Sequence, residues 1–156
     1  MVRLSKKADY ALIAMKHLAT DAPQGAANAR EIAERYRIPV ELLAKVLQRL
    51  TRRGFLVSHM GIHGGYQLAR STTAISVADI VEAIDGPFAI TACGTADDRC
   101  DQFAKCNVRD PLWRVKDRIV AVLQTVSLSE MAAGDEVGRP LKVDIGSQGV
   151  PRAVAR

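Results

Sequence analysis

The sequence predicts a mainly α-helical fold with one small β-hairpin: a winged helix-turn-helix domain followed by a long helix suited to dimerisation. Residues 1–53 give a helix, a short helix, a turn and a third helix, and residues 55–69 give a hairpin with a glycine-rich tip. A long helix with one apolar stripe follows over residues 110–125. With 156 residues and 48% apolar side chains, the chain is long enough to bury one core.

The first two helices are marked by their caps. Ser5 precedes a helix that continues to about Thr20, with apolar residues near helical spacing. Asn28, with Glu31 three residues later, forms a capping-box pattern and opens a short helix that ends near Tyr36.

The third helix is predicted over residues 40–53, and Gly54 ends it. Its apolar stripe consists of Leu42, Leu43, Val46, Leu47 and Leu50. Residues 55–60 and 66–69 are typical of two strands joined by a glycine-rich turn at residues 61–65. We expect His59 in the first strand and His17 on the surface of the first helix, because neither has a partner visible in the sequence.

The second half of the chain is predicted to hold two more main helices. Ser76 begins a helix that ends near Asp85, and a loop over residues 88–109 contains all three cysteines. Residues 110–125 carry apolar residues at the spacing of a helix–helix contact, and a short capped turn follows from Ser127. From Gly134 onward the composition predicts a mobile tail.

The positive charge is concentrated in one part of the chain. The net charge is +5, but residues 1–70 carry 12 Lys and Arg against 5 Asp and Glu, a net of +7. Residues 71–133 carry a net of −3 and residues 134–156 a net of +1. We therefore divide the chain into a DNA-binding region (1–70), a region with the linker helix, cysteine loop and dimerisation helix (71–133), and a flexible tail (134–156). A merely solvated basic surface is the alternative explanation of the charge.

The helix at residues 40–53 is the expected DNA-reading helix, because its polar face can meet base edges while its apolar stripe docks on the core. Lys45 and Gln48 have donors for base edges, Arg49 and Arg52 suit phosphates, and a glycine-rich wing tip allows close approach to a groove. The expected contacts are Glu41, Ala44, Lys45, Gln48, Arg49, Arg52, His63 and Gly64. A basic amphipathic helix alone would be ordinary, but the preceding short helix and the hairpin favour double-stranded DNA as the partner.

The cysteines follow the pattern Cys93-x6-Cys100-x5-Cys106 in one polar loop. An odd count argues against a closed disulfide framework. Clustered thiolates suit an iron–sulfur cluster first, a thiol redox switch second and zinc third, since the Cys-x2-Cys pairs of zinc ribbons are absent. A cluster normally takes four protein ligands, so a fourth ligand must come from elsewhere.

Other classes of protein fit the sequence less well. Aromatic residues make up only 4% of the chain, which disfavours a stacking platform for single-stranded nucleic acid. No stretch approaches the roughly 18 apolar residues of a membrane span, and no signal peptide is evident. We expect a cytoplasmic protein with reduced thiols, and no nucleophile–base pair or phosphate loop predicts an enzyme. A small iron–sulfur carrier would leave the basic half without a purpose.

Several stretches together resemble one family of bacterial transcription regulators, the Rrf-two family of IscR/NsrR type. They are Leu4–Ala11, Ile38–Leu43, Gly61–Ala69, Ile75–Gly86 and the cysteine loop followed by Trp113. The resemblance covers residues 1–133. It implies a homodimer on an approximately palindromic operator, in which an iron–sulfur cluster on the three cysteines sets DNA affinity. [2Fe–2S] is favoured over [4Fe–4S], and the signal would be cluster supply, oxidants or nitric oxide.

Two departures from the family pattern concern the cysteine site. The first cysteine gap is six residues where many members have five, and Arg109 stands where the IscR-type subgroup supplies a histidine ligand. Arginine is a poor ligand because it stays protonated. Other members take the fourth ligand from an acidic residue near the start of helix one of the partner subunit, and Asp9 occupies that position. Our hypothesis is that Asp9 of the partner completes the site. The alternatives are a local ion pair of Asp9 with a lysine, and Asn107, Asp110, water or an external thiol as the ligand.

Overall fold

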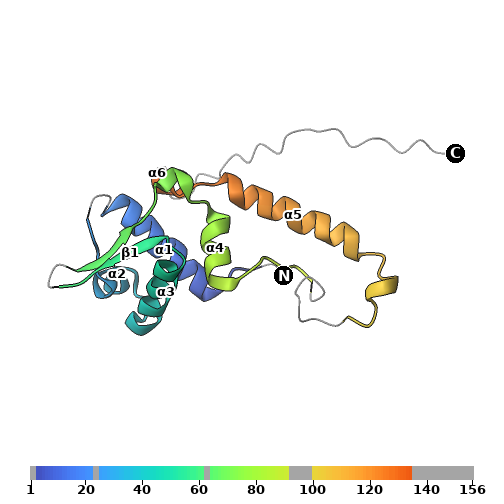
Figure 1. The fold of residues 1–156 in the computed structure, drawn as a ribbon, viewed down its shortest axis with the longest axis horizontal. Coiled ribbons are helices and arrows are strands. Elements are labelled where there is room, and N and C mark those ends of the chain that lie inside the picture. The colour runs from blue at the N-terminus through green and yellow to red at the C-terminus, as the bar shows by residue number, and fades with distance from the viewer. Residues whose placement is uncertain (1–2, 23–24, 62–63, 92–99, 135–156) are drawn as a thin grey trace.

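The structure is a computed structural model that describes residues 3–22, 25–61, 64–91 and 100–134. In chain order the elements are α1 (Lys6–Thr20), α2 (Ala29–Tyr36), α3 (Val40–Arg52), β1 (Leu56–His59), β2 (Gly65–Leu68), η1 (Thr72–Ala74), α4 (Val77–Asp85), η3 (Phe103–Lys105), α5 (Arg109–Thr125) and α6 (Leu128–Ala133). This arrangement confirms the predicted mainly α fold with a small hairpin wing (Figure 1). His63, Cys93 and the predicted tail beyond Gly134 lie outside the described residues.

Side-chain caps determine where four helices begin. Ser5 accepts a backbone N–H at the start of α1, and Asn28 does the same for α2. At α4, Ser76 and Asp79 form a reciprocal capping box, and Ser127 caps α6. Each cap satisfies a backbone N–H that has no partner inside the helix, which is why these starts could be predicted from sequence.

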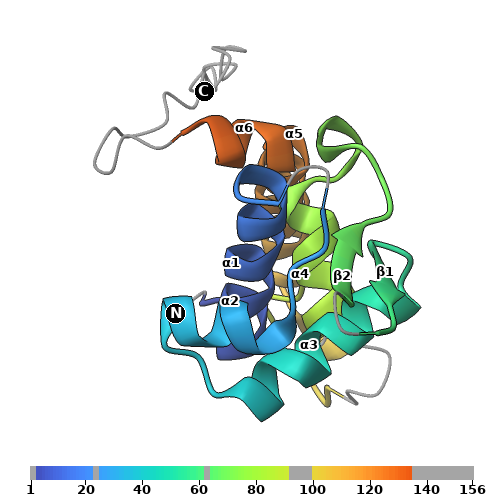
Figure 2. The ribbon, with the colours of Figure 1, turned by 90° about the vertical axis from the view of Figure 1, so that its left-hand side faces the viewer.

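One hydrophobic core joins the N-terminal region to α4 and α6. Its largest fully buried side chains are Met15, Leu18, Ile32, Leu43, Leu47, Leu50, Leu56, Ile75, Ile80 and Leu128. Helix α1 runs through the middle of this core and contacts α3, α4 and α6 (Figure 2). Helix α4 therefore packs directly against α1 and α3 of the N-terminal region.

The two strands form an antiparallel hairpin in which His59 lies opposite Gly65. A further backbone bridge joins Ala27 to Tyr66: each residue donates its N–H to the other's carbonyl oxygen, at 3.1 and 2.9 Å. This bridge attaches the wing to the segment that precedes α2. The wing is thus attached through β2 to the segment before α2.

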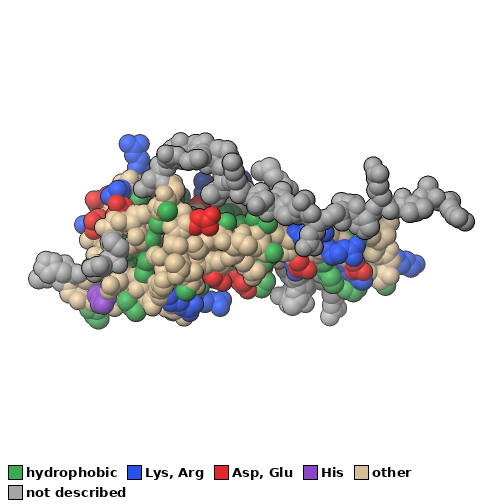
Figure 3. All heavy atoms as spheres, turned by 90° about the horizontal axis from the view of Figure 1, so that it is seen from above, with side chains coloured by type: hydrophobic (Ala, Val, Ile, Leu, Met, Phe, Trp, Pro, Cys, Tyr) green, Lys and Arg blue, Asp and Glu red, His purple; other side chains and the backbone are tan. Residues whose placement is uncertain are grey.

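Helix α5 extends away from the core (Figure 1) and has no buried residue. It contacts α4, but Val115 and Val122 of its predicted apolar stripe are 44% and 42% exposed. Seen from above, side chains of both charge signs are interspersed along the end of the molecule that α5 forms (Figure 3). No helix among the described residues has the length and apolar character needed to cross a bilayer.

The expectation for His17 is wrong. Its side chain is only 3% exposed, because the face of α1 that carries it turns toward α2 rather than toward solvent. His59 lies in β1, as expected. The strands are shorter or shifted relative to the predicted ranges 55–60 and 66–69, and α3 ends at Arg52, with Arg53 as its C-cap.

Candidate nucleic-acid interface and cysteine site

Helix α3 has the two-faced character that a DNA-reading helix needs. Leu43, Val46, Leu47 and Leu50 are buried on one face. Of the predicted contacts on the other, Glu41, Lys45, Gln48 and Arg52 are exposed and Ala44 is partly buried. Helix α3 lies along one edge of the molecule, with α2 on one side and the hairpin on the other (Figure 2). The polar side chains are therefore available to a partner along that edge.

Arg49 has a partner inside the protein. Its Nε donates a hydrogen bond of 2.8 Å to the carbonyl oxygen of Ala83 in α4. This bond ties the second half of α3 to α4 and was not evident from the sequence. The phosphate contact expected for Arg49 stays a prediction, and any such contact would have to form while Nε holds α4.

The glycines at the wing tip are required by the protein's own backbone. A Cβ at Gly64 would lie 2.9 Å from the carbonyl oxygen of Gly61, and a Cβ at Gly65 would lie 2.5 Å from that of Ala27. Neither position has room for a side chain. The expected contact of Gly64 and His63 with a DNA groove stays a prediction, and His63 is outside the described residues.

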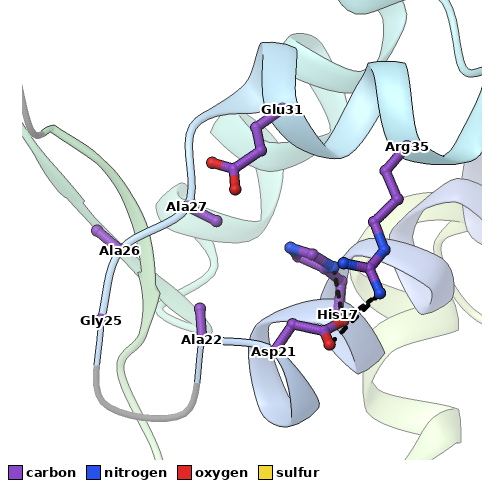
Figure 4. Close-up of a pocket in the computed structure, with 8 residues that line it drawn as sticks. All are labelled: His17, Asp21, Ala22, Gly25, Ala26, Ala27, Glu31 and Arg35. Carbon is purple, nitrogen blue, oxygen red and sulfur yellow. Dashed lines mark hydrogen bonds and ion pairs between the residues drawn. The ribbon is translucent and has the colours of Figure 1, made fainter.

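A polar network ties the end of α1 to α2 (Figure 4). The Nδ1 of buried His17 lies 3.0 Å from Oδ2 of Asp21 and 3.3 Å from the hydroxyl of Tyr36. Asp21 also pairs with Arg35 Nη2 at 3.4 Å. His17, Asp21 and Arg35 line a cavity of about 670 Å³, and Glu31 of α2 lines it as well. The network therefore links α2 to the end of α1.

The described cysteines are free thiols at the two ends of one short turn. Cys100 and Cys106 flank η3, are partly buried and form no disulfide. The backbone N–H of Phe103 donates to the carbonyl oxygen of Cys100 at 3.0 Å, which shapes the turn. No group of three His, Cys, Asp or Glu side chains able to hold a metal occurs among the described residues, a range that does not include Cys93. Two unpaired, partly buried thiols have the soft donor chemistry of an iron–sulfur site.

Arg109 joins the cysteine turn to the start of α5. Its Nη1 donates to the carbonyl oxygen of Phe103 at 3.0 Å, and its guanidinium carbon lies 4.4 Å from the Phe103 ring centroid and 5.4 Å from that of Trp113. Its Nε donates to Asp110 at 2.7 Å, and this bond is the main reason why the pKa of Asp110 lies below its usual value. A protonated guanidinium has no lone pair for a metal, so Arg109 positions the turn that precedes it.

Trp113 contributes an unpaired polar atom next to this turn. Its indole Nε1 is buried and has no hydrogen-bond partner among the described residues. A buried N–H without an acceptor is uncommon in proteins. The centroid of the Trp113 ring lies 6.4 Å from that of Phe103, so this N–H lies beside the side chains of Phe103 and Arg109 that contact the cysteine turn.

Asp9 lies on the first turn of α1, and its side chain is 43% exposed. Its carboxylate is 4.0 Å from Lys6 Nζ, at the outer limit of an ion pair, so the local pairing considered from sequence is present but weak. A shorter contact lies nearby: the Ser5 hydroxyl donates a hydrogen bond of 2.6 Å to Oδ1 of Asp85. This bond connects the start of α1 to the end of α4, from which the chain enters the cysteine loop.

The exposed polar face of α3, the wing and the basic N-terminal half define a winged-helix DNA-binding protein. Residues 4–134 match the sequence model of the Rrf2 (Rrf-two) family, which is described as an iron-dependent transcriptional regulator. The chain belongs to the Rrf2 family and is a DNA-binding transcription regulator, which confirms the resemblance inferred from its motifs.

Individual relatives agree with this assignment. The chain is 32% identical over 137 residues to the HTH-type transcriptional regulator IscR of Photorhabdus laumondii, covering 87% of this chain and 82% of that protein. Among solved structures, CymR, the global cysteine regulator of B. subtilis, superposes with a TM-score of 0.71 at 26% identity, over 85% of this chain and 97% of CymR. IscR of T. potens gives a TM-score of 0.64 at 29% identity, over 83% and 85%.

Proposed function

We propose that this regulator is a homodimer whose affinity for an approximately palindromic DNA operator is controlled by an iron–sulfur cluster on Cys93, Cys100 and Cys106. The observation that carries the proposal is the pair of free, partly buried thiols of Cys100 and Cys106 on a turn that Arg109 fixes to α5. When bound, the cluster supplies a centre that responds to oxidants, nitric oxide or iron supply. We favour [2Fe–2S] over [4Fe–4S].

The proposed fourth ligand is Asp9 of the partner subunit. The carboxylate is partly exposed, and its only ion pair among the described residues is the long one to Lys6. A carboxylate is a harder and more exchangeable ligand than a thiolate, so this bond would be the labile one. Asp9 belongs to α1, which is part of the proposed DNA-binding region. Breaking the bond between Asp9 and the cluster would therefore free the two DNA-binding regions of the dimer to move relative to each other.

The dimer is proposed to form along α5, where Val115 and Val122 of the apolar stripe are exposed among the described residues. A two-fold pair would place two α3 helices on successive half-sites of one operator. We expect the form with the cluster and the form without it to differ in operator binding by about 1–3 kcal/mol.

A cluster-free thiol switch is the second candidate. It is favoured by the structural likeness to CymR, a global cysteine regulator, and by the free thiols of Cys100 and Cys106. A small iron–sulfur carrier is a weaker alternative, since the family consists of transcription regulators.

Anaerobic purification with iron and sulfide quantification and a visible absorption spectrum tests the proposal. A brown protein whose DNA affinity falls or rises on cluster removal, at fixed salt, supports cluster control. A colourless, iron-free protein with normal DNA binding supports the thiol switch, and equal affinity of both forms contradicts cluster control.

The fourth ligand needs its own comparison. Asp9→Ala should change the visible spectrum or speed the loss of the cluster, whereas the control Asp117→Ala removes an exposed carboxylate from α5 and should change neither. If Asp9→Ala matches the unchanged protein in both measurements, Asp9 is not the ligand.

A further inference from the structure

Arg37 has a backbone conformation that is unfavourable for its residue type. It is the C-cap of α2 with φ 54° and ψ 43°, the left-handed region, and it is the one non-glycine residue with positive φ in the described part of the chain. In this region Cβ crowds the backbone, so glycine is the usual occupant of such a cap.

The turn itself explains why the left-handed conformation is needed. The N–H groups of Arg37 and Ile38 both reach back to the last turn of α2, Ile38 donating to the Ala33 carbonyl at 2.9 Å. Ile38 is then carried into the core, where it is 5% exposed. None of these contacts uses the side chain of Arg37. Folding alone would therefore be served better by glycine.

The side chain of Arg37 is exposed and has no hydrogen bond or ion pair within the described residues. Three other arginines of this half do have partners: Arg35 pairs with Asp21, Arg49 bonds to α4, and Arg70 lies over the ring of Phe55. Arg37 pairs with neither acid close to it in sequence, Glu34 and Glu41. Its guanidinium remains a charged donor with no partner among the residues that the structure describes.

Its position places this charge at the DNA interface. Arg37 lies in the turn between the two helices of the helix-turn-helix, three residues before α3 begins. When the first turns of a reading helix enter the major groove, the residues just before it pass the sugar–phosphate backbone at the groove edge. A planar guanidinium suits a phosphate because it can donate two parallel hydrogen bonds.

We propose that Arg37 is a phosphate-contacting residue of the DNA interface, placed at a backbone position where folding alone favours glycine. It lies outside the contacts predicted from the sequence, all of which are on α3 or the wing. The contact is independent of base sequence and supplies affinity and register rather than specificity. It depends on the DNA-binding fold and not on whether a cluster is bound.

The test is that Arg37→Gly moves stability and DNA affinity in opposite directions. Removing the left-handed strain should raise the melting temperature by about 2–4 °C. Losing the phosphate contact should weaken binding to a 30-base-pair duplex of arbitrary sequence on the order of tenfold at low salt. The slope of log K against log salt should become shallower by about 0.9 for each bound protomer.

Three further variants of the full-length protein separate the two effects. Arg37→Ala keeps the backbone strain and should lose affinity without gaining stability, and Arg37→Lys should keep most of the affinity and the salt slope. Arg114→Gln removes an exposed charge from α5 and should leave DNA binding unchanged. An unchanged affinity and slope in Arg37→Gly overturns the phosphate contact, and a lower melting temperature overturns the strain argument. Absence of DNA binding by the unchanged protein would instead refute the interface itself.

Discussion

Arg109 shows how a single residue changes the chemistry of a site. The family resemblance implies a histidine ligand at this position in one subgroup, and arginine cannot take that role. The structure gives it a different one, since Arg109 bonds the Phe103 carbonyl and lies against the rings of Phe103 and Trp113. The cysteine turn is thus oriented by a cation rather than by a metal–imidazole bond.

Trp113 is the only tryptophan of the chain, so its fluorescence reports on the packing of Phe103, Arg109 and Trp113. We predict that Arg109→Ala shifts the emission of Trp113 to longer wavelength and increases its quenching by acrylamide, because the ring loses the guanidinium and Phe103 loses its anchor. Arg109→Lys should give a partial effect, since lysine keeps the charge without the planar stacking.

Arg118→Ala is the matched control, because it removes an exposed arginine from the same helix without changing the contacts among Phe103, Arg109 and Trp113. An emission spectrum and quenching constant of Arg109→Ala equal to those of the control would show that Arg109 does not hold the turn.

Burial of polar side chains was the hardest residue property to predict. His17 follows Lys16 in an amphipathic helix and was expected at the surface, yet it is buried beside Tyr36, which lies 19 positions away. Its two partners, Asp21 and Tyr36, make burial tolerable by satisfying Nδ1. Periodicity within one helix carries no information about such partners, and the same holds for the bond of Arg49 to α4.

At the scale of elements, the wing depends on a close backbone contact that leaves no room for Cβ. We predict that Gly65→Ala destabilises the protein by about 1–3 kcal/mol, because the new methyl group meets the Ala27 carbonyl and must displace the wing from the segment before α2. The measurement is urea unfolding followed by circular dichroism.

Gly25→Ala tests the specificity of this effect, because a Cβ at Gly25 meets nothing within 4 Å. It should leave the free energy of unfolding nearly unchanged. If the two variants unfold at the same urea concentration, the bridge between the wing and Ala27 does not contribute to stability.

Element starts were far more predictable than element contacts. The caps at Ser5, Asn28, Ser76 and Ser127 are local signals, because cap and helix lie within a few residues of each other. The bridge from Ala27 to the hairpin and the η3 turn have no such signal. Likewise, motif and composition pointed to α3 and the cysteine loop, whereas Arg37 emerged only from its backbone angles.

At the scale of the whole molecule, the basic N-terminal region and the region that carries the cysteine turn share one core. Leu128 of α6 and Ile80 of α4 are buried against the helices of the first half. The second region is therefore packed onto the first rather than attached as a separate unit. Hydrogen bonds from Ser5 to Asp85 and from Arg49 to the Ala83 carbonyl add polar links between the same two regions.

Helix α5 exposes two valines, Val115 and Val122, and we propose that a second copy of the chain packs against them. We predict that the double variant Val115→Asp and Val122→Asp is a monomer by sedimentation velocity, because unpaired carboxylates cannot be buried in an apolar interface. Both valines are more than 40% exposed in the single chain, so the monomer should keep its helical circular dichroism. Its operator affinity should fall, since each half-site would bind one protomer alone.

Gln124→Asp adds a charge at an exposed position on the same helix and should remain a dimer. A dimer that survives the double variant would place the subunit interface away from these two valines.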